Sequence, residues 1–201
     1  MTRALLTTLL CLGAAVPCRA QQPDSTTYVV LPTSDLAVET SKAGVFGLFG
    51  HTHRIRAHAF DGRIVYVPGR PESSRIALRL PTDSLEVVSS DTTEQRKVGA
   101  NMKVEVLDVA HFPEMTFVSK ALKWDGKKLH LTADLTMHGQ TQPVEMDAEP
   151  VITADTVRAE VRFKVKQTAF GIHPFSTAAG TVKVGDEVEF DIKLVAVRRE
   201  Q

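Results

Sequence analysis

The chain has 201 residues, of which 43% are hydrophobic and 24% are charged. This is the composition of an ordinary globular protein, and it excludes disordered, collagen-like and coiled-coil chains. The 24 Lys and Arg residues are matched by 24 Asp and Glu residues. The chain therefore lacks the basic excess that nucleic-acid binding requires, and no nucleic-acid partner is expected. The length fits one domain, or at most two.

The first 20 residues have the pattern of a secretory signal. Arg3 supplies a positive charge, residues 4–16 are mainly apolar, and Cys18 and Ala20 are small residues before a cleavage site. The apolar run is ~13 residues, shorter than the ~20 that a membrane-spanning helix needs. We therefore expect cleavage after Ala20, a periplasmic or secreted location, and no stable membrane insertion. A retained membrane anchor and a lipid-modified Cys18 are the alternatives.

Removal of residues 1–20 also removes both cysteines, Cys11 and Cys18. The mature chain then has no thiol for a disulfide, a cysteine-ligated zinc ion or a nucleophile. The rest of the sequence shows no internal repeat, linker or change of composition. We expect residues 24–199 to form a single domain.

Apolar and polar residues alternate in five runs of the mature chain. The runs cover residues 75–80, 129–138, 144–149, 157–165 and 188–194. Successive side chains of a strand point to opposite faces, so each run predicts a strand with one apolar and one wet face, as in antiparallel sheets.

Dipeptides typical of tight turns lie between or beside these runs. They are Asp61-Gly62, Asp125-Gly126 and Gly185-Asp186, and residues 138–140 separate two alternating runs. Short connections between such strands predict an all-β sheet that closes into a barrel or folds into a sandwich. The periodicity does not choose between the two.

One segment favours a helix. Asp91 is a suitable N-cap with Glu94 three residues later, and Val98, Met102 and Val106 follow at helical spacing. The helix should end before Pro113, because proline disfavours helical geometry in the residue before it. A single amphipathic helix among strands can close a barrel end or lie on a sheet.

Three blocks of sequence, in order, carry a resemblance to a known family. They are residues 107–119 (LDVAHFPEMTFVS), residues 131–144 (LTADLTMHGQTQPV), and residues 170–172 (FGI) followed by 184–190 (VGDEVEF). Together they resemble the YceI-like family of lipid- and polyisoprenoid-binding proteins. The similarity runs from residue 89 to 197 and is looser over 28–88, where residues 60–64 (FDGRI) still match.

The resemblance implies a single extended, lipocalin-like antiparallel β-barrel of about eight strands with one short helix near a barrel end. It also implies a long apolar tunnel for an isoprenoid or another single-chain lipid, with no catalytic residue and no cofactor. The sequence departs from the family pattern at residues 50–53 and 173–174. The apolar faces of the strands predict these tunnel-lining residues: Ile55, Leu78, Phe117, Leu131, Leu135, Met146, Phe163 and Phe190.

Gly50-His51-Thr52-His53 is the sharpest short motif. On a strand, His51 and His53 share a face and could bind a metal ion, but a site needs at least a third ligand. His58 falls on the opposite face. The additional motifs of metallophosphatases, which share Gly-His-x-His, are missing. We therefore expect His53 to lie at the barrel mouth with hydrogen bonds to backbone, and no metal site.

Three functions remain open from the sequence. The leading one is a non-enzymatic, exported carrier or reservoir for an isoprenoid or fatty-acyl lipid, with any self-association expected to give a homodimer. The second is a metal-binding protein or hydrolase that uses His51 and His53. The third is an interaction or envelope-stress module, in which the same apolar faces form an ordinary packed core.

Overall fold

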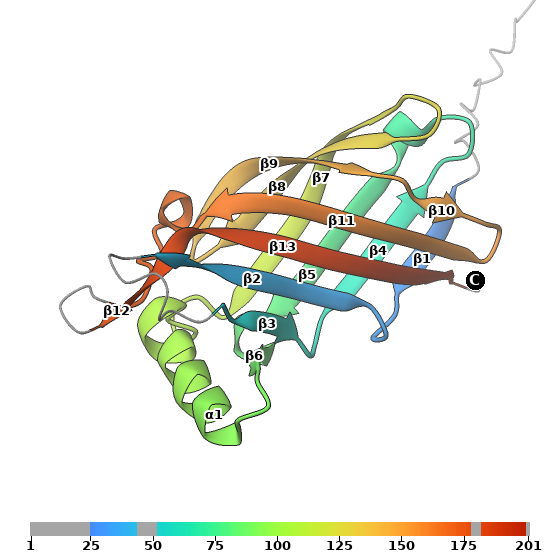
Figure 1. Cartoon of the computed structure of the whole chain (residues 1–201). Helices are drawn as coiled ribbons and strands as arrows, with labels where there is room; N and C mark the ends of the chain where they lie inside the picture. The colour runs from blue at the N-terminus through green and yellow to red at the C-terminus, as the bar shows by residue number, and fades with distance from the viewer. Residues whose placement is uncertain (1–24, 44–51, 178–181, 200–201) are drawn as a thin grey trace, which may run out of the picture.

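The computed structural model describes residues 25–43, 52–177 and 182–199. The expected signal segment, residues 1–20, lies outside the described residues. In the described part, one antiparallel sheet curves around an apolar interior, and one α-helix lies beside one end of it (Figure 1). No helix of these residues is long and apolar enough to cross a membrane.

The described residues form thirteen strands. They are β1 (Thr26–Val30), β2 (Asp35–Ala43), β3 (Arg54–Ala57), β4 (Asp61–Tyr66), β5 (Arg75–Pro81), β6 (Leu85–Val88), β7 (Glu114–Trp124), β8 (Leu129–Met137), β9 (Gln140–Ala148), β10 (Val151–Ile152), β11 (Thr156–Lys166), β12 (Ser176–Thr177) and β13 (Val182–Arg198). The helical elements are α1 (Thr92–Asn101), a π-helical turn η3 (Met102–Val106), and the 3-10 turns η1 (Pro71–Ser73), η2 (Thr82–Ser84) and η4 (Gln167–Phe170).

The long strand β13 organises the sheet. One of its edges pairs with β2 and then with β1, and the other edge pairs with β11. Ser34 joins β1 to β2, and its hydroxyl both accepts from the Val195 N–H (3.0 Å) and donates to the Val195 carbonyl (3.1 Å). The sheet continues from β1 through β4, β5, β7 and β8 to β9, and from β2 through β3 to β6.

β9, at one end of this strand order, lies beside β11, with Cα atoms within 8 Å. The described residues nevertheless form no ladder between β9 and β11, and β6 is a second edge that pairs only with β3. The expected single closed barrel is therefore not confirmed. The fold is an all-β antiparallel sheet with one short helix, and its ladders do not close into a ring.

Alternating polarity produces the strands as predicted. Along β8 every second residue from Leu129 to Met137 is buried, and the residues between them are half-buried. The buried face of β9 consists of Val144, Met146 and Ala148. All five alternating runs coincide with strands, except that His138 and Glu149 lie one residue beyond β8 and β9, because burial of one face is a local consequence of the period of two.

Two of the predicted turns are confirmed. Asp125-Gly126 connects β7 to β8, where the Asp125 carboxylate accepts from the Lys128 N–H (2.9 Å). His138 and Gly139 connect β8 to β9, and both have positive φ values of 49° and 71°. Two such residues in succession are typical of the type I′ turns that match the twist of hairpin strands.

The two other predicted turns are wrong. Asp61-Gly62 begins β4, where Gly62 pairs with Leu78 and the space for a Cβ is occupied by the Leu78 and Val30 side chains. Gly185 and Asp186 lie inside β13, at an irregularity of the β2–β13 register. In both cases the glycine lies within a strand. Gly62 allows close approach of the neighbouring side chains, and Gly185 allows a bulge.

The helix begins where the sequence predicts it. The Asp91 carboxylate accepts from the N–H groups of Thr93 (2.8 Å) and Glu94 (3.2 Å). The α-helix ends at Asn101 and continues as a π-helical turn to Val106. Met102 is buried against the core and Val98 is half-buried, so this side of the helical segment faces the sheet interior.

Candidate functional site: an apolar cavity

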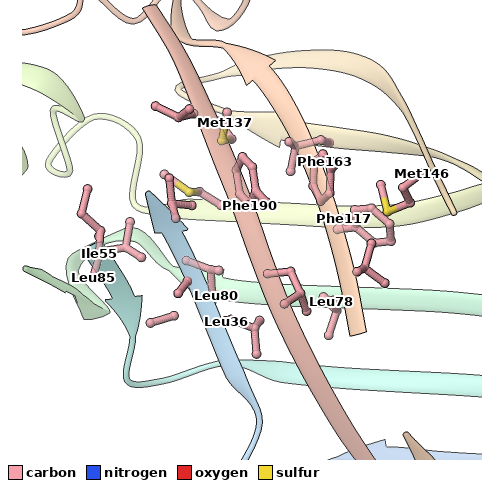
Figure 2. A pocket seen from close by; sticks show the side chains of 18 of the residues that line it. Leu36, Ile55, Leu78, Leu80, Leu85, Phe117, Met137, Met146, Phe163 and Phe190 are labelled. Atoms are coloured by element: carbon pink, nitrogen blue, oxygen red, sulfur yellow. The ribbon is translucent and has the colours of Figure 1, made fainter. Parts of the chain in front are cut away.

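The inner face of the sheet surrounds a cavity of about 610 Å³. This volume lies within the ~300–1,000 Å³ that is typical of small-molecule sites. Side chains from most strands, from α1 and from η3 line it, and most of them are aliphatic, aromatic or thioether groups. Figure 2 shows Phe117, Met146, Phe163 and Phe190 converging on this space from β7, β9, β11 and β13.

All eight side chains that the sequence predicts as lining residues lie on the cavity wall. They come from seven strands and are Ile55, Leu78, Phe117, Leu131, Leu135, Met146, Phe163 and Phe190. Their contact with a bound lipid stays a prediction.

The wall also contains residues that sequence reasoning missed. Leu36 and Val38 of β2 line the cavity, and the apolar run between Asp35 and Glu39 was a usable signal. Trp124 lines it from the last position of β7. Met102 lines it from the helical segment, where the helical spacing predicted an apolar face but not its contact with the cavity.

Four methionines lie on the wall: Met102, Met115, Met137 and Met146. They come from η3, β7, β8 and β9. The chain has five methionines, of which the fifth is Met1. Because thioether side chains are flexible and polarisable, they adapt to ligands of irregular shape.

One group of polar side chains on the wall belongs to α1 and the β2–β3 segment. Glu94, Lys97 and Asn101 of the helix line the cavity, together with Thr40 and His53 of the neighbouring β2–β3 segment. These side chains could face the polar end of a ligand whose chain lies among the apolar groups.

A buried amide also belongs to the wall. Gln167 is 8% exposed, and its amide group donates to the Gly185 carbonyl (2.9 Å). This bond connects η4 to the bulge of β13, so the amide has a structural role.

His53 lies on the cavity wall and is half-buried. Its backbone N–H donates to Thr40 Oγ1 (2.9 Å), and its carbonyl accepts from the Thr40 N–H (3.0 Å). His51 lies outside the described residues, so the structure does not place the His51–His53 pair. The part of the chain that is described contains no group of three or more His, Cys, Asp or Glu residues able to hold a metal ion.

His130 forms an ionic cluster on the outer face that the sequence did not predict. Its Nδ1 lies 2.7 Å from Asp147 and its Nε2 lies 3.1 Å from Asp125. These hydrogen bonds, first to Asp125 and then to Asp147, raise the pKa of His130. The Lys128 N–H, followed by His130, lowers the pKa of Asp125, and His130 lowers the pKa of Asp147. The cluster connects the β7–β8 turn to β9.

The other described histidines are dispersed. His58 pairs with Glu86 (3.1 Å), and His111 contacts Asp108 (2.8 Å). The His138 ring packs against Phe112 at a centroid distance of 4.0 Å. His173 is exposed in the segment before β12. The structure does not bring these residues together into a catalytic or metal site.

Arg54 holds three carboxylates on the outer face of the sheet. Its guanidinium lies 2.9 Å from Asp35, 2.7 Å from Glu39 and 3.1 Å from Asp191. Asp191 also accepts from Arg162 (3.2 Å). Burial acts to raise the pKa of Asp191, but the hydrogen bonds from Arg162 and Arg54 outweigh it and lower the pKa. The network ties β2, β3, β11 and β13 together.

The structure defines an all-β antiparallel sheet around an apolar cavity, and comparison with known proteins gives the family. Residues 30–196 match the model of the YceI-like domain. The chain belongs to the YceI-like family.

Curated relatives match over a shorter stretch. A UPF0312 protein of Pseudomonas putida (strain GB-1) is 42% identical over 90 residues, and Protein YceI of Salmonella arizonae is 31% identical over 90 residues. These alignments cover 44% and 45% of this chain and 44% of each relative. The matched part is therefore less than half of the length of these relatives.

Solved structures share the fold. BcnA of Burkholderia cenocepacia superposes with a TM-score of 0.68 at 19% identity, over 83% of this chain and 98% of that protein. A polyisoprenoid-binding domain of Saccharophagus degradans, implicated in plant cell wall breakdown, superposes with a TM-score of 0.61 at 12% identity, over 88% of this chain and 100% of that domain. At these identities the similarity shows the fold alone.

Proposed function

We propose that this protein is an exported, non-enzymatic binding protein that holds one isoprenoid or other single-chain lipid in the apolar cavity. The observation that supports the proposal is the apolar lining of a cavity of about 610 Å³. Membership of the YceI-like family supports a hydrophobic ligand, and the fold is shared with a polyisoprenoid-binding domain. The signal-like residues 1–20 support a periplasmic or secreted location.

The energetics of a chain in this cavity favour binding. Each methylene transferred from water to an apolar wall gains ~0.8 kcal/mol, so a chain of about ten carbons retains several kcal/mol after ordering costs. Most of the described wall is aliphatic or aromatic, which supports carriage over catalysis.

Native mass spectrometry tests the proposal directly. Protein from its native host should carry a mass excess of one lipid per chain, which disappears after extraction with organic solvent. The extracted chain should recover the excess when incubated with an isoprenoid alcohol such as geranylgeraniol. Failure to find stoichiometric lipid in either sample would overturn the carrier proposal and favour a packed scaffold.

A matched pair of variants tests the cavity as the binding site. Leu135 is 6% exposed and points into the cavity, whereas the neighbouring Thr136 faces outward and bonds the Thr141 hydroxyl (2.8 Å). Leu135→Asp is expected to abolish lipid uptake while the fold survives, since water can reach the carboxylate once the lipid is absent. Thr136→Asp should leave uptake unchanged.

The same pair distinguishes a carrier from a packed core. In a packed core the buried carboxylate introduced by Leu135→Asp would cost several kcal/mol of stability. Normal lipid retention by Leu135→Asp would show that the inner face is assigned wrongly.

A further inference from the structure

β9 and β11 lie side by side, and a short ladder joins the chain after β9 to the start of β11. β10 follows β9 after Glu149 and Pro150, and it pairs with β11 at Val151–Arg158 and Ile152–Val157. On the other side of Pro150 this pairing stops, and β9 keeps only its ladder with β8 while β11 keeps only its ladder with β13. Pro150 lies where the strands part, and its nitrogen has no hydrogen to donate to a ladder.

We call the strip between residues 140–148 of β9 and residues 159–166 of β11 the seam. One end of the seam is bounded by the β10–β11 ladder. The other end is bounded by a hydrogen bond from the Gln142 side-chain amide to the Ala169 carbonyl (2.9 Å). Between these limits the described strands run close together without backbone hydrogen bonds. Figure 1 shows β11 between β9 and β13.

Ion pairs do not fasten the seam either. Asp147 of β9 contacts His130 of β8 (2.7 Å), and Arg162 of β11 contacts Asp191 of β13 (3.2 Å). These two charged residues are thus held by the neighbouring strand on the paired side. Among the described residues, no salt bridge joins β9 to β11. The two edges share an apolar core, to which Val144 and Met146 of β9 and Val161 and Phe163 of β11 belong.

The wall is thin at this place. A second hollow of about 490 Å³ lies at the seam, lined by residues of β9, β10 and β11 and of the β7–β8 turn that include Lys128 and the exposed Arg158. Ala148 of β9 and Ala159 of β11 line both this hollow and the inner cavity. Two methyl side chains therefore contribute to the partition between the outer hollow and the tunnel.

From these observations we propose that the seam is a lateral portal, through which a single acyl or isoprenoid chain moves sideways into the cavity and out again. The proposal rests on the proposed lipid-binding function. Opening the seam disrupts apolar contacts only, whereas separation of the paired strands elsewhere in the sheet breaks a hydrogen-bonded ladder. The chain passes between unpaired strands, and both ends of the seam stay anchored.

A reversible cross-link across the seam tests the portal. The register of the β10–β11 ladder, continued along the strands, places Glu145 opposite Lys164, and both are exposed. Glu145→Cys and Lys164→Cys are introduced into a chain that carries Cys11→Ser and Cys18→Ser. A short bis-methanethiosulfonate reagent then joins the two thiols. The control joins Arg63→Cys to Ala77→Cys, which are exposed direct partners in the β4–β5 ladder and line neither hollow.

Stopped-flow fluorescence with cis-parinaric acid, a single-chain fatty acid, gives the readout. The seam cross-link is expected to lower both the association and the dissociation rate by about tenfold or more, with Kd unchanged within about twofold. A blocked route slows entry and exit equally, and a thiol reductant should restore both rates. The control cross-link should change neither rate.

Unchanged rates in the cross-linked seam variant overturn the portal and leave lipid binding intact. Absence of probe binding to the chain before cross-linking overturns the proposed function and the portal with it. Ala159→Phe tests the same passage without a reagent. The phenyl ring is larger than the methyl group it replaces, so it should obstruct the path between the hollow and the cavity. It should slow both rates, and wild-type rates in this folded variant count against the portal.

Discussion

Phe163 and Phe190 stack across the β11–β13 ladder, with ring centroids 4.7 Å apart and ring planes 6° from parallel. The two residues are direct partners in the register, and both lie on the cavity wall. Aromatic pairs of this kind contribute about 0.5–1.5 kcal/mol beyond their buried area. The stack therefore sets how far this part of the wall projects into the cavity.

Phe190→Ala is expected to lower the free energy of unfolding by about 2–4 kcal/mol, because the stack and the packing of one ring are lost. The wider cavity should then favour branched isoprenoid chains over straight acyl chains. Urea denaturation measures the first effect, and competition between geranylgeraniol and a straight-chain fatty acid measures the second. Lys193→Ala, on the exposed face of β13, is the control. An unchanged ligand preference in Phe190→Ala would contradict the sizing role.

Gly139→Ala should destabilise the β8–β9 hairpin by roughly 1–3 kcal/mol. Gly139 has φ +71°, and a Cβ there would lie 2.8 Å from Cε1 of Phe112. Gly69→Ala is the matched control, since Gly69 has φ +75° but open space around its Cβ position. Thermal unfolding of both variants separates backbone strain from steric overlap. Equal losses would show that the contact with Phe112 has no effect.

The His130 cluster should make stability depend on pH. A raised histidine pKa stabilises the fold below the ordinary value of 6.5, and this contribution disappears as the pH rises through the pKa of the folded state. The lowered pKa values of Asp125 and Asp147 stabilise above 3.8, and their contribution disappears in more acidic solution. The cluster is therefore most effective between pH 3.8 and pH 6.5.

Comparison of wild type with His130→Asn tests this dependence. The difference in Tm should be larger at about pH 5 than at about pH 8.5. The exposed His173→Asn serves as control and should show no such change. A Tm difference for His130→Asn that is constant with pH would rule out the ionic contribution.

Loss of the Arg54 guanidinium should weaken the outer face of the sheet. Arg54→Gln leaves three carboxylates without their shared cation, and a loss of about 2–4 kcal/mol is expected at neutral pH. The loss should shrink in acid, because the stability linked to the lowered pKa of Asp191 is present above 3.8 and disappears as the pH falls through the folded pKa. Urea denaturation across pH measures this, with Arg96→Gln on the exposed face of α1 as control. A loss that persists at low pH would indicate a packing effect.

Local patterns in the sequence were sufficient to predict the alternating strands and which face of each strand is buried. Leu131 and Leu135 lie on the cavity wall because side-chain alternation depends only on neighbouring residues. The Asp91 cap was visible for the same reason, since all its partners lie within three residues.

Features that depend on distant segments could not be predicted in this way. The His130 cluster requires Asp147, which is 17 residues away. The bulge at Gly185 arises from the pairing of β13 with β2, and the seam lies between β9 and β11, two strands whose ladders are formed with β8 and β13. Pro150 is visible in the sequence, but the sequence does not show that the β10–β11 ladder ends there. That conclusion requires the register between distant strands.

The placement of the methionines would let NMR follow the cavity separately from the rest of the protein. Four of the five methionine methyl groups in the chain belong to the cavity wall. Cleavage after Ala20 would remove Met1, so a mature sample labelled with ¹³C only at methionine methyl carbons would give an NMR spectrum of four signals, all from the wall. These four probes sit on η3, β7, β8 and β9, so their separate shifts would report how far along the interior an added chain extends.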